Sequence, residues 1–486
     1  MRTGFLTAIA VSAPLLIVAC GGDAGPTQPA APTKLVFTVH PTNAAGAQLI
    51  TPPVQITVQD ASGNTVTNAT TTVTVALGAN PGAATLSGTL TVAAIQGIVT
   101  FSNLRIDRPG SGYTLVASAG GLSGATSTPF AVTLTFAAVS ASSEHTCGVA
   151  GAGAAYCWGD NSSGRLGDGT TTDRSSPVLV AGGVSFATVS AGGGRTCGVT
   201  AAGAAYCWGY NQDGEVGDGG TISPRLGPVL VAGGVTFTAV SAGFNHTCGV
   251  TAAGAAYCWG ENFLGQLGDG TTTNRSSPVL VAGGVSFAAV SAGSIHTCGV
   301  TAAGAAYCWG NNSEGQLGDG TTTSRASPVL VAGGVSFAAV SAAGTEHTCG
   351  VTAAGAAYCW GERSMLGGGN MTTTNALTPG LVVGGVSFAA VSAGSFHTCG
   401  VTVEGAAYCW GSGGEGELGD GSATPLVQET PGLVVGGVSF AAVSPGDRYT
   451  CGVTAAGAAY CWGWNLYGQL GDGTTINRLT PVRVVQ

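Results

Sequence analysis

Apolar and polar positions alternate along most of the chain in short runs that glycine-rich turns separate. Between residues 35 and 133 the runs are LVFTVHP, VQITVQDASGN, TTTVTVAL, GIVTFSNLRI, GYTLVASA and TPFAVT. Successive side chains of a strand point to opposite faces of a sheet, so a period of two indicates half-buried strands. Many short strands with regular turn signals are typical of an all-β sandwich, and we expect one over residues 35–133.

From about residue 134 a longer unit recurs seven times. The first cysteines of successive copies are 50, 51, 50, 51, 50 and 52 positions apart. Each unit holds four apolar segments, such as SFAAVSA, HTCGVT, AAYCWG and PVLV. A period of this length indicates a propeller or a solenoid, and closing a ring removes the exposed sheet edges that favour aggregation. The sequence therefore predicts an all-β chain with a seven-bladed β-propeller over residues 134–486.

The linkers predict how the ring closes. A long linker joins AAYCWG to PVLV, whereas only AGGV joins PVLV to the next SFAAVSA, so we expect the latter two segments to form a hairpin within one blade. Residues 135–141 and 481–486 then each lack a hairpin partner. Pairing them would satisfy the backbone hydrogen bonds of both strands, and deleting 481–486 should open the ring.

Each repeat contains two cysteines ten positions apart. In CGVTAAGAAYC, residues 248–258, TAAG predicts a type I turn followed by Gly254 at positive φ. This register places Cys248 opposite Cys258 in a non-hydrogen-bonded pair, which is close enough for a disulfide. We therefore expect seven disulfides within hairpins: Cys147–Cys157, Cys197–Cys207, Cys248–Cys258, Cys298–Cys308, Cys349–Cys359, Cys399–Cys409 and Cys451–Cys461.

Metal binding is the competing interpretation of these cysteines. Structural zinc sites favour Cys-x2–4-Cys spacing, which the repeat lacks. Histidine directly precedes the TC segment in five repeats, at His145, His246, His296, His347 and His397. Arg195 and Tyr449 occupy this position in the other two repeats, and arginine cannot be a ligand. We expect these side chains to pack or to form hydrogen bonds.

Other candidate constellations also have structural interpretations. The segment DNSSGRLGDGT resembles a calcium loop but lacks the glutamate at its twelfth position, so we interpret Asp-Gly as turn chemistry. We expect the seven repeated tryptophans, from Trp158 to Trp462, to pack within the blades. No nucleophile elbow or phosphate loop is recognisable. We expect no metal, no cofactor and no catalytic residues.

The composition and the N-terminus indicate export. Charged residues make up 8% of the chain, the formal net charge is −9, and no basic patch suggests nucleic-acid binding. The segment FLTAIAVSAPLLIVA suits a secretory signal but is too short for a confident membrane span. It ends in IVAC, which resembles a bacterial lipoprotein signal. The resemblance implies a signal peptide over residues 1–19, lipidation of Cys20 and a linker over residues 20–34; an ordinary signal peptide is the alternative.

The repeat HTCGVTAAGAAYCWGENFLGQLGDGT resembles that of the regulator of chromosome condensation family. The matching positions are His246, Thr247, Gly254, Tyr257, Trp259, Gly260, Asn262, Gly265, Gln266, Leu267 and Gly268. The resemblance covers the whole repeat region and implies a seven-bladed propeller. It does not fix a function, because the founding member is a nuclear guanine-nucleotide exchange factor while bacterial relatives include a secreted β-lactamase inhibitor. Residues 35–133 resemble bacterial immunoglobulin-like domains, which usually act as spacers.

The seven copies differ mainly in two loops. One precedes HTC (SSE, GGG, GFN, GSI, GTE, GSF, GDR) and the other follows WG (DNSS, YNQD, ENFL, NNSE, ERSM, SGGE, WNLY). Chain direction places both loops on one face of the disc, opposite the constant TAAG and AGG turns. A uniform scaffold with diverse loops on one face is typical of a binding platform, although unconstrained drift is the alternative. Our candidate partner-binding residues are Tyr210, Phe244, Phe263, Ile295, Phe396, Trp464 and Tyr467.

These observations predict a non-enzymatic, lipid-anchored protein of the cell envelope. We expect a monomer at the outer membrane or cell surface that binds a protein or glycan and contacts the membrane only through its lipid. A polysaccharide-active enzyme is the alternative, and it would gather carboxylates in one pocket of the variable face. Guanine-nucleotide exchange is a further alternative that export disfavours, because cytosolic GTPases would be out of reach.

Overall fold

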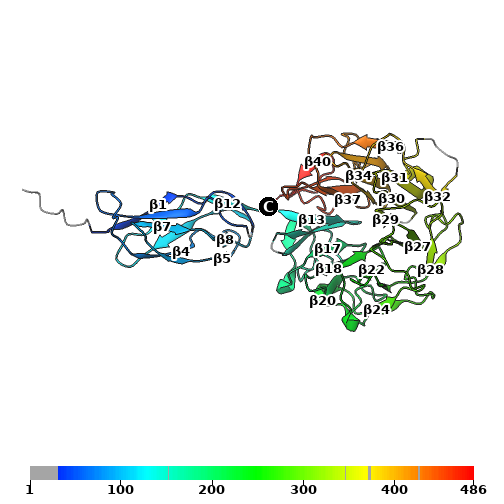
Figure 1. Cartoon of the computed structure of the whole chain (residues 1–486), viewed down its shortest axis with the longest axis horizontal. Coiled ribbons are helices and arrows are strands. Elements are labelled where there is room, and N and C mark those ends of the chain that lie inside the picture. Colours follow the sequence, from blue (N-terminus) through cyan, green and yellow to red (C-terminus); the bar gives the residue numbers. More distant parts are fainter. Residues whose placement is uncertain are drawn as a thin grey trace, which may run out of the picture.

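The structure is a computed structural model that describes residues 31–46, 48–151, 153–344, 346–369, 374–424 and 427–485. It contains two β-rich parts in series: residues 34–133 hold strands β1–β12, and residues 136–483 hold β13–β40 (Figure 1). Cys20 and the expected signal peptide lie outside the described residues. Within the described ranges, no helix is long and apolar enough to cross a bilayer.

The N-terminal part packs four small sheets around one apolar core. In β4, Val73 and Val75 are buried while Thr72 and Thr74 are exposed, which is the predicted alternation. The sheets are β1 (Lys34–Val39), β3 (Val54–Gln59) and β7 (Ile98–Phe101); β11 (Ala125–Thr126), β10 (Leu115–Ser118), β4 (Thr72–Leu77) and β6 (Thr91–Ala93); β2 (Ala44–Ala45), β12 (Phe130–Thr133) and β9 (Gly110–Tyr113); and β5 (Leu86–Ser87) with β8 (Arg105–Ile106). Its immunoglobulin-like character stays a prediction.

Seven four-stranded antiparallel sheets form the blades of the propeller. Blade 1 contains β13 (Phe136–Ala141), β14 (His145–Ala150), β15 (Ala155–Gly159) and β16 (Arg174–Leu179), ordered from the axis outwards. Blades 2 to 4 contain β17 (Thr188–Ala191), β18 (Arg195–Val199), β19 (Ala205–Gly209), β20 (Arg225–Leu230); β21 (Ala239–Ala242), β22 (His246–Val250), β23 (Ala256–Gly260), β24 (Arg275–Leu280); and β25 (Ala289–Ala292), β26 (His296–Val300), β27 (Ala306–Gly310), β28 (Arg325–Leu330).

Blades 5 to 7 repeat this order. They contain β29 (Ala339–Ala343), β30 (His347–Val351), β31 (Ala357–Gly361), β32 (Ala376–Leu381); β33 (Ala390–Ala393), β34 (His397–Val401), β35 (Ala407–Gly411), β36 (Gln428–Leu433); and β37 (Ala442–Pro445), β38 (Tyr449–Val453), β39 (Ala459–Gly463), β40 (Arg478–Arg483). Three 3-10 turns complete the elements: η1 (Ala181–Gly183), η2 (Ala232–Gly234) and η3 (Arg363–Met365).

The central hairpin of each blade has the predicted register. In blade 3, Gly254 has φ +81°, and the Thr251 amide donates to the Ala255 carbonyl over 3.0 Å. Cys248 then lies opposite Cys258, with their Cα atoms 4.1 Å apart and a disulfide between them. All seven predicted pairs form disulfides within their own hairpins.

The predicted ring closure is wrong. Residues 135–141 contribute β13 to blade 1, where it pairs with β14, whereas β40 pairs with β39 in blade 7. The long linker returns to the outer edge of its own blade, so AAYCWG and the following PVLV segment share a sheet. AGG turns, with two glycines at positive φ such as Gly182 and Gly183, carry the chain to the next blade. Deleting 481–486 should therefore shorten one outer strand rather than separate a shared blade.

An asparagine folds the long linker back onto its blade. In blade 3, the Asn262 side chain accepts the Leu267 amide over 2.9 Å and donates to the carbonyls of Thr271 and Thr273, each over 3.1 Å. Asp269 then forms a 2.7 Å ion pair with Arg275, the first residue of the outer strand. Burial alone would raise the pKa of Asp269, but hydrogen bonds from Thr271 and Arg275 hold it below its ordinary value.

The same linker also locks each blade to the next. In blade 1, the Gly169 amide donates to the Leu226 carbonyl of blade 2 over 3.0 Å, and the Arg165 carbonyl accepts the Trp208 indole over 2.9 Å. At the junction of blades 7 and 1, Gly473 donates to the Ser175 carbonyl over 2.9 Å in the same way. The ring therefore closes through a seventh copy of the ordinary blade junction, and β13 and β37 lie beside each other in Figure 1.

A buried polar ring runs through all seven blades. The five histidines that precede TC have fully buried side chains, and each Nε2 contacts the hydroxyl of the TC threonine in the next blade, as His296 does with Thr348 over 2.9 Å. Arg195 Nε donates to Thr247 over 2.9 Å, and the Tyr449 hydroxyl lies 3.0 Å from that of Thr146. These contacts support the structural interpretation of the seven positions.

Candidate functional site

The two variable loops of every repeat lie on the same face. The first residue of the second loop donates its amide to the carbonyl of the last residue of the first loop in all seven blades, as Trp464 does to Arg448 over 2.9 Å. We call the surface formed by residues 142–144 and 160–163, with their equivalents in the other blades, the variable face. The hairpin turns, such as 251–254, lie at the opposite strand ends and form the constant face.

The first loops of all seven blades surround a pocket on the propeller axis. This axial pocket has a volume of about 380 Å³, and serine, alanine and glycine supply most of its wall. Amides of one blade donate to carbonyls of the next around the rim: Gly193 to Gly243, Phe244 to Gly293, Ser294 to Gly344, Ser395 to Gly446 and Asp447 to Ser142, over 2.8–3.0 Å. The rim is therefore held in place before any ligand binds.

A ladder of serine hydroxyls reinforces the wall below the rim. The Ser241 hydroxyl accepts the Ala292 amide of the next blade over 2.9 Å, and equivalent bonds join five other blade pairs. Between blades 6 and 7, the acceptor position faces Pro445, which has no amide hydrogen. The ladder is thus interrupted at Ser392.

The structure brings together some of the predicted partner-binding residues. Phe244, which is 48% exposed, and the half-buried Phe396 line the axial pocket. Trp464 and Tyr467 form an edge-to-face pair with ring centroids 5.5 Å apart. The remaining three, Tyr210, Phe263 and Ile295, lie on the variable loops of blades 2, 3 and 4, outside the lining of the pocket.

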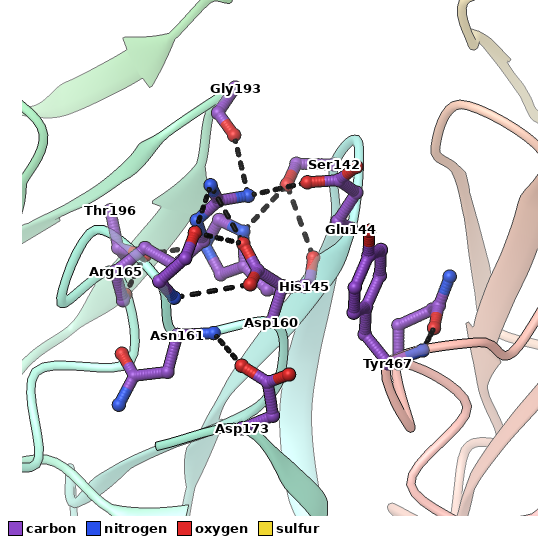
Figure 2. A network of polar contacts seen from close by, with 12 residues as sticks. Ser142, Glu144, His145, Asp160, Asn161, Arg165, Asp173, Gly193, Thr196 and Tyr467 are labelled. Atoms are coloured by element: carbon purple, nitrogen blue, oxygen red, sulfur yellow. Dashed lines mark hydrogen bonds and ion pairs between the residues drawn. The ribbon is translucent and has the colours of Figure 1, made fainter. Parts of the chain in front are cut away.

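Some variable loops are fixed by their own charges. Arg165 forms ion pairs with Glu144 over 3.1 Å and with Asp160 over 2.7 Å, and it donates to the Gly193 carbonyl of blade 2 (Figure 2). Figure 2 also shows Tyr467 of the last repeat at the edge of this network. One arginine therefore ties both loops of blade 1 to the first loop of blade 2.

The variable face carries more carboxylates than cations. Burial raises the pKa of Glu261, Glu346 and Asp447 from their ordinary values, and Glu314 and Glu362 add to the effect at Glu346. A raised pKa means that the protein around these groups does not fully replace the water and counter-charges that favour ionisation. The face is consequently suited to a partner that brings positive charge.

The residues that suggested metal binding are engaged within the fold. Asp168 of DNSSGRLGDGT accepts from the Thr170 hydroxyl over 2.7 Å and pairs with Arg174 over 2.8 Å. Burial lowers the pKa of His246 and His296 to about 3, so their imidazoles are neutral in the folded ring. In the part of the chain that the structure describes, no three His, Cys, Asp or Glu side chains form a metal-ligand group.

Sequence reasoning missed the axial pocket and Asp447. The pocket wall is built from the serines, alanines and glycines of VSAG segments, which carry no chemical signature in the sequence. Asp447 belongs to the variable GDR loop, but nothing in the sequence separates it from the other carboxylates of the variable loops. Only the ring geometry shows that this loop reaches the axis.

Comparisons with known proteins give the family. An RCC1-like domain model matches residues 120–386, which is more than half of the chain. Models of the regulator of chromosome condensation (RCC1) repeat match residues 388–417, 440–469 and 456–486. The chain therefore belongs to the family of proteins with an RCC1-like domain.

Individual relatives are more distant. The chain is 43% identical to the ultraviolet-B receptor UVR8 of Arabidopsis thaliana over 42 residues, which span 9% of this chain and 10% of that protein. The structure of human WBSCR16 is similar with a TM-score of 0.62 and 22% identity, covering 68% of this chain and 95% of that one. The structure of Prp20p of Saccharomyces cerevisiae, described with its binding to Gsp1p and histones, is similar with a TM-score of 0.60 and 19% identity. The likeness covers 73% of this chain and 88% of that one. These likenesses show the propeller fold.

Proposed function

We propose that this protein is a non-enzymatic binding protein whose variable face captures a protein partner. The observation that carries the proposal is the segregation of sequence variation. Both variable loops of all seven repeats meet on one face through a recurring hydrogen bond, while the turns of the other face barely differ. Exposed aromatic side chains and uncompensated carboxylates are concentrated on this variable face. Surfaces with such anchors are typical of protein interfaces.

The family supports the choice of a protein over a glycan. RCC1-like propellers are known protein-interaction scaffolds, and yeast Prp20p is described with protein partners. Sequence identity below 25% supports a shared fold but not shared partners. The partner of this chain therefore has to be found by experiments on the chain itself. An enzyme would need a converging set of reactive groups, and the axial pocket instead has a wall of serine, alanine and glycine.

We further propose that the protein is exported and attached to the outer membrane through a lipid on Cys20. Paired cysteines in every blade suit an oxidising compartment, and IVAC at residues 17–20 supports lipidation. Replacing Cys20 with serine should move the protein from the membrane fraction to the soluble fraction without changing its thermal midpoint. Retention of the Cys20→Ser protein in the membrane fraction would contradict the lipid anchor.

The binding proposal is tested by capture from envelope extract with immobilised full-length protein. The test variant combines Phe244→Ala, Phe396→Ala and Trp464→Ala. The matched control combines Leu280→Ala, Leu330→Ala and Val403→Ala, whose side chains are 53%, 53% and 82% exposed outside the variable face. We expect wild type and control to capture the same partner in similar amounts. The triple variant should capture at least ten-fold less of it.

Thermal unfolding of the three proteins separates loss of contact from loss of fold. The test variant should unfold within about 3 °C of wild type, because Phe244 is exposed and Phe396 and Trp464 are half-buried, so none of the three belongs to the core of a blade. Equal capture by the triple variant and wild type would exclude the variable face. Capture that survives complete protease digestion of the extract would identify a glycan instead of a protein.

A further inference from the structure

The axial pocket places a single charge in a neutral wall. Among the described residues that line it, Asp447 is the only charged one, and the others are mainly serine, alanine and glycine from all seven blades. Phe244 and Phe396 add two aromatic rings at the rim. A pocket with apolar edges and one carboxylate has the chemistry to select a ligand with a short apolar stem and a positive end.

Asp447 is held firmly but forms no ion pair with the described residues, although the positive charge of the adjacent Arg448 partly offsets the rise in its pKa. Its amide donates to the Ser142 carbonyl of blade 1 over 3.0 Å, and its carboxylate hydrogen-bonds the Ser395 side chain of blade 6. None of the ion pairs formed by the described residues involves it. Burial raises the pKa of this carboxyl, so its charged form gains from a positive ligand.

Three arginines near the pocket are engaged elsewhere, among them Arg165 with Glu144, Asp160 and the Gly193 carbonyl. Arg448 lies exposed with its guanidinium carbon 5.7 Å from the centre of the Phe396 ring. Arg195 lies buried behind the opposite wall, where it donates to the carbonyls of Gly243, Phe244 and His246. None of these three arginines lines the pocket, so the pocket side of Asp447 is open to an incoming cation.

The break in the serine ladder adds a polar group on that same side. Ser392 belongs to the inner strand of blade 6 and lines the pocket, but Pro445 of blade 7 offers it no amide hydrogen. The serine hydroxyls at equivalent positions accept such an amide in six blade junctions. Ser392 and Asp447 therefore give the blade 6–7 sector two acceptors, one of them a ladder hydroxyl whose equivalents in the other six junctions accept an amide.

We propose that the axial pocket binds the side chain of a lysine that projects from the protein partner. Its ammonium pairs with Asp447 and donates to the Ser392 hydroxyl, and its methylene stem lies between Phe244 and Phe396. A compact ammonium with three donors fits one carboxylate and neighbouring hydroxyls better than a planar guanidinium, which favours bidentate pairing. The inference rests on the proposed capture of a protein by the variable face.

The test uses small probes and the full-length protein, so it needs no knowledge of the partner. N-acetyl-lysine methylamide is titrated by ligand-observed NMR, with N-acetyl-norleucine methylamide as the neutral probe and spermidine as a free polyamine. Asp447→Asn removes the charge while keeping the size and the Ser395 hydrogen bond. Glu404→Gln removes one negative charge from a hairpin turn of the constant face and is the matched control.

We expect the lysine probe to bind wild type and Glu404→Gln equally, and at least ten-fold more tightly than the norleucine probe. Asp447→Asn should lose that preference at an unchanged thermal midpoint. No binding of the lysine probe, equal binding of the norleucine probe, or unaltered binding by Asp447→Asn would each overturn the proposal. Ten-fold preference for spermidine would assign the pocket to polyamines and overturn it as well. Capture by the aromatic triple variant tests the variable face independently, so failure of the lysine pocket is distinguishable from failure of the binding face.

Discussion

Asn262 and Phe263 are neighbours in the chain but belong to two regions that obey different constraints. Asn262 is fully buried and closes its loop with hydrogen bonds to Leu267, Thr271 and Thr273, whereas Phe263 is 65% exposed on the variable face. The frame of blades, disulfides and buried polar residues repeats nearly unchanged, and the loops it carries diverge. The difference indicates that the frame is constrained by folding, while the loops remain available for recognition.

Acid should produce the largest effect on the frame. Burial lowers the pKa of His246, His296 and His397 to about 3, while unfolded histidine titrates near 6.5. Between these values the unfolded chain binds protons that the folded chain excludes, so the free energy of unfolding falls as pH decreases through this window. Between pH 7.5 and pH 5.5, each of these three histidines should lower the free energy of unfolding by about 1.4 kcal/mol.

Urea unfolding at pH 7.5 and pH 5.5 checks this expectation. His296→Gln keeps a hydrogen-bonding group near Thr348 but cannot be protonated. It should therefore reduce the change in the free energy of unfolding between the two pH values by the contribution of one histidine. His40→Gln, in the N-terminal part, is the control. A stability that does not change between the two pH values would mean that the buried histidines are not held neutral.

Removing a junction tryptophan should have the next largest effect. Trp208 is fully buried, and its indole donates to the Arg165 carbonyl of the preceding blade. Trp208→Ala should cost about 3–5 kcal/mol, because it leaves a cavity and removes a hydrogen bond at a blade junction. Tyr210→Ala, two residues later on the variable face, should change stability by less than about 0.5 kcal/mol. Similar thermal shifts for the two variants would remove the distinction between frame and face.

Opening one disulfide should have a smaller effect. The Cys248–Cys258 bridge closes a hairpin loop of about eleven residues, for which the chain-entropy estimate is about 2.5–3 kcal/mol. The double variant Cys248→Ala/Cys258→Ala should therefore unfold at lower temperature while keeping partner capture at temperatures where it remains folded. Loss of capture by the folded double variant would show that the hairpin contributes directly to binding.

Asn262 and Phe263 themselves provide the finest comparison. Asn262→Ala should cost about 1–2 kcal/mol, because the Leu267 amide and two carbonyls lose their partners. Phe263→Ala should change the free energy of unfolding by less than about 0.5 kcal/mol. If Phe263→Ala destabilised the protein and Asn262→Ala did not, the assignment of Asn262 to the frame and Phe263 to the variable face would be wrong.

The sequence predicted what local chemistry determines. TAAG turns set the hairpin register, and the register alone placed all seven cysteine pairs opposite each other. Chain direction through these hairpins also predicted that both variable loops share a face. Such inferences succeed because turn geometry and strand alternation act over only a few residues.

The errors concern contacts between repeats. The long linker suggested a crossing between blades because the sequence does not reveal that Asn262 and its equivalents fold it into a compact loop. The shared closing blade was consequently wrong, and the seventh junction turned out to match the others. The threonine partners of the histidines and the axial pocket were also missed, because both depend on residues about 50 positions apart meeting across blade boundaries.

Hydrogen–deuterium exchange of the full-length protein, with and without its captured partner, tests the central claim most directly. The account predicts that binding slows exchange in the variable loops, including amides near Phe244, Phe396 and Trp464, and leaves constant-face turns such as 251–254 unchanged. Protection confined to the constant-face turns or to the N-terminal part would contradict the assignment of the variable face as the binding surface.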